Sequence, residues 1–341
     1  MRKLYRLATI FTSTRFDKLF RIARPLFCNE VAILTYHRVI DTEKNYPFDS
    51  DLISATPDSF AKQMRYIKSS YHPISMSKFI DSIENDKKLP KNAIMVTFDD
   101  GFDDNYKNAY PILKELDIPA TFFVSTDYIG KPDTIWYERL AYFFNRVTSQ
   151  NIIIKELNLE FMLSESNKQE CYIELIEKFK LIDDKKRKDI LNALYKKYGD
   201  PYLNISSKDK KLSQFMTWEQ LKELSENNIT INAHSHSHPI LSMLSPEELN
   251  FELNEPKKII EEKLCSTVES LAYPVGQEES ISDSVKIETK KNNYKVAFSF
   301  ISGMCDLNNV DKFNIKRLHV EKEYPFALFK SMLSFPKIFA E

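Results

Sequence analysis

The chain has 341 residues, of which 43% are hydrophobic and 28% are charged, and its formal net charge is −1. This composition is typical of a soluble globular protein with a large core. The near-neutral net charge gives no support for nucleic-acid binding, which requires a basic face, so no nucleic-acid partner is expected. The four cysteines lie far apart and form no CxxC pair, so the sequence suggests neither a thiolate zinc site nor a dense disulfide framework.

Residues 1–29 form a basic segment that is predicted to be helical. Its only acid is Asp17, and its apolar residues recur at roughly helical spacing. We expect this segment to pack on the domain. The alternative is a basic amphipathic helix, residues 1–28, that lies on an anionic membrane surface. Its longest apolar run is too short for a signal-peptide core or a membrane span, so we expect a location in the cytoplasm or on the cytoplasmic face of the inner membrane, with an extracellular location as the alternative.

From residue 30 onward, strand patterns alternate with helix patterns. The predicted strands cover residues 30–39, 93–102, 120–126, 229–234, 267–276, 294–300 and 314–320. The predicted helices cover residues 56–70, 104–116, 217–227 and 245–264, with one more between the strands at 267–276 and 294–300. Thr56 before Pro57, and Thr217 three residues before Gln220, are signals for helix N-termini. The alternation predicts an α/β fold with a parallel sheet, either open or closed into a barrel.

Residues 138–213 interrupt this alternation. Within them, residues 151–163 have the pattern of a hairpin or irregular strands, and residues 168–199 are charged and helical. We interpret the segment as an insertion in the scaffold whose lysine and glutamate runs form a solvated face.

Polar residues stand where four of the predicted strands end. These residues are His37, Asp99 with Asp100, His234, and Tyr273. Because the carboxyl ends of parallel strands carry the active sites of such folds, we expect these side chains to meet. His72 has no acidic or basic neighbour and is interpreted as structural.

The stretch TFDDG, residues 97–101, ends one of these strands with two carboxylates. Adjacent side chains of a strand point in different directions, so one aspartate can bind a metal while the other accepts a proton. Gly101 permits a sharp turn of the backbone directly afterwards.

The stretch AHSHSHPI, residues 233–240, contains three of the six histidines. In an extended chain His234 and His238 would be about 13 Å apart, which favours neighbouring i, i+2 pairs as chelators. If the chain coils after Ala233, His234 and His238 converge and His236 turns away. Three imidazoles so close together predict a metal site.

A hydrolytic metal site also needs a base and an acid. Asp99 is the candidate base, and His37 or His319 is the candidate acid, because both histidines lie at or near strand ends.

These stretches resemble the polysaccharide deacetylases of carbohydrate esterase family 4. TFDDG resembles the first motif of the family, HSHSHP (234–239) the second and AYPVG (272–276) the third. TYHRV (35–39) is similar to the branch that includes poly-N-acetylglucosamine deacetylases. The resemblance covers about residues 30–320 without the insertion. It implies a distorted (β/α) barrel of about seven strands, with a catalytic domain at residues 30–337.

The resemblance also implies roles for individual residues. Asp100, His234 and His238 would bind a divalent metal, with zinc as the expected ion, and Asp99 would be the base. His236 would be a bystander. The backbone N–H of Val275 would donate to the oxyanion, a contact worth about 3 kcal/mol of barrier.

The sequence departs from the family pattern at two positions, which affect the arginine that orients the base and the histidine that acts as the acid. The third motif usually begins with an arginine that orients the catalytic aspartate, but here the position is Ala272, and Arg38 or Arg317 is the candidate replacement. The fifth motif, which carries the acid histidine, has no clean copy. His319 stands near its expected place, whereas the early Tyr-His motif implies His37, which we favour.

The expected function is therefore metal-dependent removal of N-acetyl groups from amino sugars of a polysaccharide, an oligosaccharide or a lipid-linked glycan. The alternatives are an O-acetyl esterase or deformylase acting on a sugar, and a non-catalytic glycan-binding member of the fold. Trp136, Tyr137 and Tyr273 could stack on sugar rings or be core aromatics.

Overall fold

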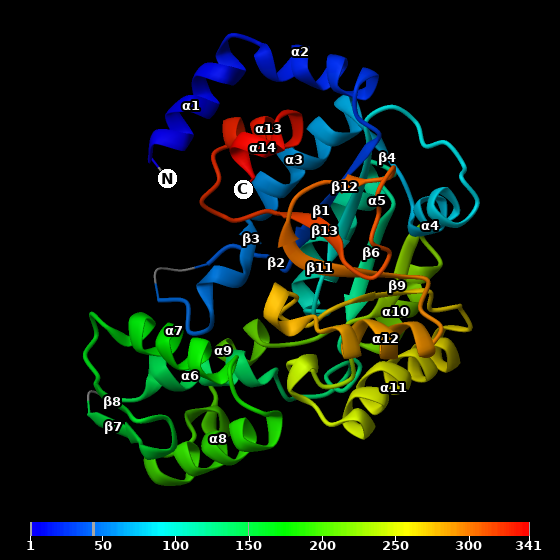
Figure 1. The fold of residues 1–341 in the computed structure, drawn as a ribbon. Helices are drawn as coiled ribbons and strands as arrows, with labels where there is room; N and C mark the ends of the chain where they lie inside the picture. Colours follow the sequence, from blue (N-terminus) through cyan, green and yellow to red (C-terminus); the bar gives the residue numbers. More distant parts are fainter. Residues whose placement is uncertain (1, 43–44, 149, 341) are drawn as a thin grey trace.

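Seven parallel strands close into a barrel at the centre of the molecule, as the computed structural model shows (Figure 1). Around the barrel the order is β1 (Glu30–Tyr36), β13 (Ile315–His319), β11 (Val296–Ser302), β10 (Ser270–Ala272), β9 (Ile229–Ala233), β6 (Ala120–Val124) and β5 (Ala93–Phe98), and β5 pairs again with β1. The predicted distorted barrel of about seven strands is thereby confirmed. The structure describes residues 2–42, 45–148 and 150–340. Met1 of the predicted N-terminal segment and Ser149 of the predicted insertion lie outside the described residues.

Short strands extend the barrel wall. β12 (Cys305–Asp306) pairs antiparallel with the start of β1, and β4 (His72–Pro73) pairs with the start of β5. β2 (Arg38–Val39) and β3 (Ile53–Ala55) form a separate parallel pair.

Helices surround the strands (Figure 1). They are α3 (Pro57–Ser70), α4 (Met76–Glu84), α5 (Tyr110–Glu115), α10 (Trp218–Ser225), α11 (Pro246–Leu264), α12 (Asp283–Lys291), α13 (Phe326–Ser334) and α14 (Pro336–Phe339). Thr56 and Thr217 accept the expected N-cap hydrogen bonds, the latter within a capping box. The helix expected at 104–116 begins instead as a π-helical turn, η3 (Asn105–Ala109), and becomes α-helical at Tyr110, because Pro111 has no N–H and suits a first turn.

Single turns of 3₁₀ helix connect several of these elements. They are η1 (Arg24–Leu26), η2 (Ser50–Leu52), η4 (Lys155–Leu157), η5 (Pro201–Asn204), η6 (Leu241–Met243) and η7 (Glu278–Ser280).

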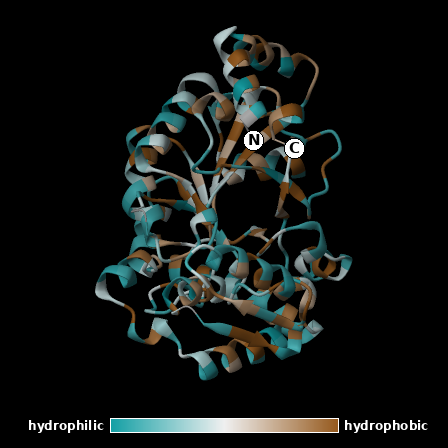
Figure 2. Ribbon diagram, turned by 90° about the vertical axis from the view of Figure 1, so that its left-hand side faces the viewer, coloured by the Kyte–Doolittle hydropathy of each residue, from teal (hydrophilic) through white to brown (hydrophobic). Residues whose placement is uncertain are grey.

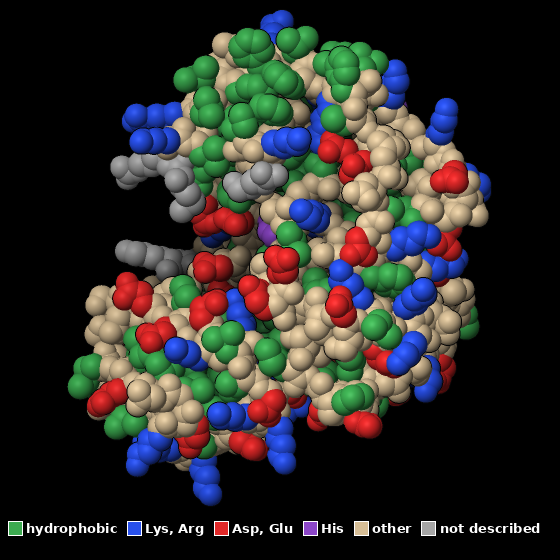
Figure 3. All heavy atoms as spheres, viewed as in Figure 1, with side chains coloured by type: hydrophobic (Ala, Val, Ile, Leu, Met, Phe, Trp, Pro, Cys, Tyr) green, Lys and Arg blue, Asp and Glu red, His purple; other side chains and the backbone are tan. Residues whose placement is uncertain are grey.

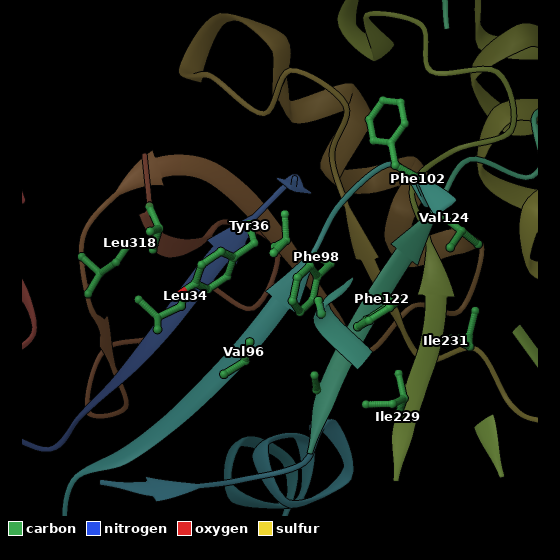
Figure 4. Packing of buried hydrophobic residues seen from close by; sticks show 14 of the residues in the cluster. Leu34, Tyr36, Val96, Phe98, Phe102, Phe122, Val124, Ile229, Ile231 and Leu318 are labelled. Atoms are coloured by element: carbon green, nitrogen blue, oxygen red, sulfur yellow. The ribbon is translucent and has the colours of Figure 1, made fainter. Parts of the chain in front are cut away.

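Alternate residues of the barrel strands belong to two different hydrophobic clusters. Leu34, Val96 and Phe122 point outward against the helices (Figure 4). Val31 and Phe123 belong to an inner cluster that α4 closes at the amino ends of the strands. Both faces of each strand are therefore apolar, as in barrels covered by helices, and Figure 2 shows hydrophobic strands inside a shell of mixed helices. The same alternation decides which side chains enter the open mouth of the barrel.

The inserted segment lies between β6 and β9 in the chain and has a core of its own. It contains α6 (Trp136–Arg146), the antiparallel hairpin β7 (Asn151–Ile154) and β8 (Leu159–Met162), α7 (Lys168–Phe179), α8 (Asp184–Tyr198) and α9 (Ser207–Leu212). Its buried apolar residues, from Leu140 to Leu194, form a cluster separate from that of the barrel helices.

The N-terminal segment packs on the C-terminal helices. α1 (Arg2–Ser13) and α2 (Phe16–Ala23) lie across α13 and α14 (Figure 1). Ala8 is fully buried there, and the ring of Phe11 lies 5.4 Å from that of Phe339. Among the described residues, no helix is both long and apolar enough to span a lipid bilayer.

Candidate active site

A pocket of about 370 Å³ opens at the carboxyl ends of the barrel strands. In Figure 3 it lies in the hollow between the barrel and the insertion, where a histidine side chain is visible. Every predicted catalytic and metal-binding residue lines this pocket: His37, Asp99, Asp100, His234, His238, Val275 and His319. The structure therefore brings together residues that are up to 282 positions apart in the chain, from 37 to 319.

Asp100, His234 and His238 form a buried cluster in this pocket. The Nε2 atoms of both histidines lie 3.4 Å from Oδ1 of Asp100, and the possible ligand atoms of the three residues lie within 4.8 Å of one another. The chain coils after Ala233, so the rings of His234 and His238 come to 4.9 Å between centroids instead of the extended separation. The i, i+4 pair is therefore the pair that converges.

The donor set of this cluster fits a divalent metal. Nδ1 of His234 donates to the carbonyl of Ala272 at 2.8 Å, which leaves a lone pair on Nε2. Both carboxylate oxygens of Asp100 are buried and accept no hydrogen bond in the described chain. Two ligands about 2.05 Å from a tetrahedral zinc would be about 3.3 Å apart, close to the contacts here. A buried carboxylate without a donor is explained by such an ion.

The site contains strained backbone conformations. Asp100, Ser235, His238 and Val275 have φ angles of 73°, 60°, 57° and 63°, the left-handed region that such residues seldom occupy. Each costs on the order of 1–3 kcal/mol, and such residues concentrate at functional sites. For His238 the strain is offset locally, because its N–H donates to Oγ of Ser235 and its carbonyl accepts from the indole N–H of Trp136.

His236 points away from the cluster. Its Nδ1 contacts the hydroxyl of Thr126 at 2.9 Å, and its ring lies edge-on to Phe251. Glu252 accepts hydrogen bonds from the backbone N–H groups of His236 and Ser237 and thereby holds the loop; no sequence motif marks this anchoring residue. This geometry supports the prediction that His236 is no metal ligand.

Asp99 forms a fully buried ion pair with Arg317. The guanidinium donates to both carboxylate oxygens, at 2.8 and 2.7 Å, and its Nε donates to the carbonyl of Ser299. Burial alone would raise the pKa of Asp99, but the charge of Arg317 outweighs it and the pKa is lowered. Of the two candidate arginines, Arg317 contacts Asp99, whereas Arg38 pairs with Asp104 on the outer side of the strands.

Asp100 is also held ionised. Burial would raise its pKa, but the nearby rings of His234 and His238 bring the pKa well below the ordinary value. The two aspartates are thus both carboxylates, one paired with an arginine and the other facing two imidazoles.

Phe300 separates the two candidate acids. The ring of His319 stacks on Phe300 with centroids 3.6 Å apart, and His37 meets the same ring edge-on at 5.3 Å. Burial and Arg317 lower the pKa of His319 to about 3, so this ring is neutral near pH 7. Burial also lowers the pKa of His37, but the charges of Asp100 and Asp99 oppose the shift. His37 is therefore the better placed of the two to carry a proton.

Val275 occupies a tight turn beside the pocket. Its N–H donates to no acceptor within the described part of the chain. The turn is held by Gly276, which accepts from the N–H of Phe300 at 2.7 Å and has no room for a Cβ, because that atom would lie 2.6 Å from the nitrogen of Phe300. A free N–H at the pocket wall suits the predicted oxyanion donor.

The three aromatic candidates have structural partners. Tyr273 is 1% exposed and donates to the carbonyl of Phe313, and Tyr137 packs edge-on against His238. Trp136 is half-buried under the guanidinium of Arg187. All three border the pocket, but only Trp136 keeps appreciable exposed surface.

The insertion forms one wall of the pocket. Tyr172 and Ile176 of α7, with Lys180 just beyond it, line the cavity. The hydroxyl of Tyr172 donates to Asp49 at 2.8 Å and so connects the insertion to the loop before η2. No motif marked these residues in the sequence, because their position depends on how the insertion docks.

The family model for polysaccharide deacetylases matches residues 86–297, more than half of the chain. The poly-β-1,6-N-acetyl-D-glucosamine N-deacetylase of Staphylococcus aureus is 33% identical over 111 residues, which is 30% of this chain and 38% of that protein. The chain matches between 38% and 57% of the length of its curated relatives.

Two solved structures share the fold. Deacetylase PplD from Streptococcus pyogenes, in complex with acetate, has a TM-score of 0.60 at 20% identity and covers 89% of this chain and 99% of its own. IcaB from Ammonifex degensii has a TM-score of 0.55 at 16% identity, and the match covers 86% of this chain and 92% of IcaB. The resemblance seen in the motifs is confirmed, and with it the predicted hydrolase class at the level of the family. The chain belongs to the polysaccharide deacetylase family.

Proposed function

We propose that the protein removes N-acetyl groups from the N-acetylglucosamine units of a glycan by metal-dependent hydrolysis and releases acetate. The observation that carries this proposal is a single pocket that contains an unpartnered buried Asp100 between two histidines, beside a second carboxylate held by Arg317. These are the parts that amide hydrolysis needs: a metal position, a base and a neighbouring acid.

Asp100, His234 and His238 would hold the ion. Two imidazoles with one carboxylate suit zinc and leave a coordination position open. When bound, a divalent ion supplies Lewis-acid polarisation of the acetyl carbonyl and lowers the pKa of water.

The residues of the chain perform the remaining steps. Asp99, ionised and held in place by Arg317, accepts the proton of the attacking water. The N–H of Val275 donates to the oxygen that becomes negative as the carbonyl carbon turns tetrahedral. Protonated His37 donates its proton to the sugar nitrogen as the C–N bond breaks, so the amine leaves neutral. His319 stacks on Phe300 and so holds the Phe300 ring against His37.

The relatives support the choice of glycan. The staphylococcal relatives are named for poly-β-1,6-N-acetyl-D-glucosamine, and their match covers a third of this chain or less. We therefore take a β-1,6-linked N-acetylglucosamine oligomer as the first substrate to test. An O-acetylated or N-formylated sugar would use the same groups, because the acyl carbon is attacked in the same way.

The experiment measures acetate released from β-1,6- and β-1,4-linked N-acetylglucosamine oligomers by the zinc-loaded full chain, beside Asp99→Asn. We expect release that falls by at least 10³-fold in the variant and that chelation abolishes. Metal-loaded protein that binds the oligomers without releasing acetate would contradict the proposal in favour of a glycan-binding role. Release only from O-acetylated sugars would contradict the N-acetyl assignment.

A further inference from the structure

The outer face of α1, α2 and the η1 turn that follows them exposes a run of large apolar side chains. Their exposed fractions range from 37% to 84%, with Phe27 the most exposed. They are Leu7, Ile10, Phe16, Leu19, Phe20, Ile22, Leu26 and Phe27, and we call them the N-terminal apolar face. Figure 3 shows hydrophobic side chains gathered at the top of the molecule, over these helices. Contiguous exposed apolar surface of this kind marks an interaction site.

Apart from Phe20, whose ring also stacks on Phe335 at 4.8 Å, this face is distinct from the side of the helices that packs on the domain. Ala8 is buried against α13, and Phe11 lies among the rings of Phe335 and Phe339. α1 and α2 therefore have apolar residues on two sides, and packing on the domain accounts for only one of them. The interpretation as a helix that packs on the domain leaves the second side unexplained.

The exposed charged side chains of residues 3–28 are all cationic, and the nearest acid after them, Glu30, is paired with Arg24. Asp17, the only acid in residues 1–28, is 1% exposed and faces Lys330 at 3.5 Å, so it does not contribute to the outer surface. Lys3, Arg6 and Lys18 are exposed and form no ion pair within the described residues. The helices thus present apolar side chains flanked by unpaired cations, which is the pattern that complements an anionic lipid surface.

A groove of about 400 Å³ continues this face between α2 and α14. Phe20, Phe27 and Phe335 line it, together with Lys316 and Lys337, which form no ion pair within the described residues. Glu30 also lines it, but its charge is paired with Arg24. An apolar groove with lysines at its border fits an acyl chain below an anionic headgroup.

We propose that the N-terminal apolar face docks the protein on a bilayer containing anionic phospholipid, with α1 and α2 lying in the plane of the interface. Helices of this kind bury their apolar side about 5–10 Å into the headgroup boundary. A second copy of the chain fits the face less well, because two such faces would bring cations of the same sign together. The proposal is independent of the reaction in the pocket.

The experiment is co-sedimentation of the full chain with vesicles of phosphatidylcholine alone or with 30% phosphatidylglycerol (about one lipid in three), at two salt concentrations. Two triple variants test the apolar and the cationic parts: Ile10→Gln, Leu19→Gln, Phe27→Gln; and Lys3→Gln, Arg6→Gln, Lys18→Gln. Two matched triple variants on the exposed surface of the insertion are controls: Met162→Gln, Leu181→Gln, Leu203→Gln; and Lys185→Gln, Lys186→Gln, Lys196→Gln.

We expect binding to the anionic vesicles that weakens with salt. Each cation near such a surface contributes about fivefold in partitioning, so the cationic variant should bind on the order of 100-fold more weakly. The apolar variant should lose at least tenfold, and both controls should stay within about twofold. Equal binding to both kinds of vesicle, or equal losses in the controls, would overturn the proposal. So would a dimer in sedimentation velocity that only the apolar variant dissociates, without vesicle binding.

Discussion

The ion pair between Asp99 and Arg317 should control catalysis through the position of the base, and Arg317→Met tests this. Both side chains are at most 2% exposed, so solvent does not screen the pair. The substitution removes both hydrogen bonds to Asp99 as well as the one to the carbonyl of Ser299. Asp99 is then a buried carboxylate without its cation.

The magnitude follows from this burial. Removing one partner of a buried pair costs about 3–5 kcal/mol of stability, because the other charge stays buried without compensation. A base that is free to move by an ångström costs about 100-fold in rate, so kcat/KM should fall by roughly that factor, mostly in kcat. Adding Asp99→Asn should recover part of the lost stability, since no buried charge then remains unpaired, while activity stays lost.

Arg38→Met is the matched control. Arg38 is equally buried and pairs with Asp104, but it does not contact Asp99. We expect a comparable loss of stability in urea unfolding and a kcat that changes by less than about threefold below the unfolding transition. The milder Arg317→Lys keeps the charge and secures a folded protein for the rate assay. The reasoning is refuted if Arg38→Met lowers kcat as much as Arg317→Met does.

Three further predictions concern the pocket and its surroundings. His236→Ala should retain one bound zinc per chain by elemental analysis, whereas His238→Ala should lose it; a loss in both would disprove the assignment. His37→Ala should lower kcat by about 10²–10⁴-fold and His319→Ala by about tenfold or less, and the reverse order would make His319 the acid. Burial raises the pKa of Glu138 to about 8, above its ordinary 4.5, so the folded state holds a proton that the unfolded state has released. The free energy of unfolding should therefore fall by up to about 1.4 kcal/mol per pH unit as the pH rises from about 4.5 to about 8. Glu138→Gln should flatten that slope in urea unfolding at pH 5.5 and 8, and an unchanged slope would show that Glu138 does not titrate there.

Successive side chains of a strand alternate between the inside and the outside of the barrel, so odd and even positions, the parity of a residue, face opposite ways. This parity explains much of what the sequence could predict. In β1, Val31 and Ile33 point into the barrel, so His37 has the same parity and faces the mouth. Arg317 follows Ile315 by two residues and is likewise inward, whereas Arg38 has the opposite parity. The choice between the two arginines was therefore accessible from the alternation of the strands, although the motif comparison left it open.

Parity does not determine which inward residues meet. Thr35 lies beside both Thr97 and His319 because of the register of β1 with β5 and β13, and that register places Arg317 within reach of Asp99. Register depends on closure of the whole barrel, which no local pattern encodes. The stacking of His319 on Phe300, which separates the two candidate acids, is a consequence of the same closure.

The sequence by itself determined the class of fold, the strand ends and the motifs of the family, because hydrophobic periodicity, helix caps and short polar stretches are local properties. Only the tertiary structure decided that Tyr172 of the insertion reaches the pocket, that Asp17 is buried and leaves the N-terminal apolar face cationic, and that Arg317 holds Asp99. These contacts join residues more than 100 positions apart, and their geometry depends on the packing of complete elements against one another.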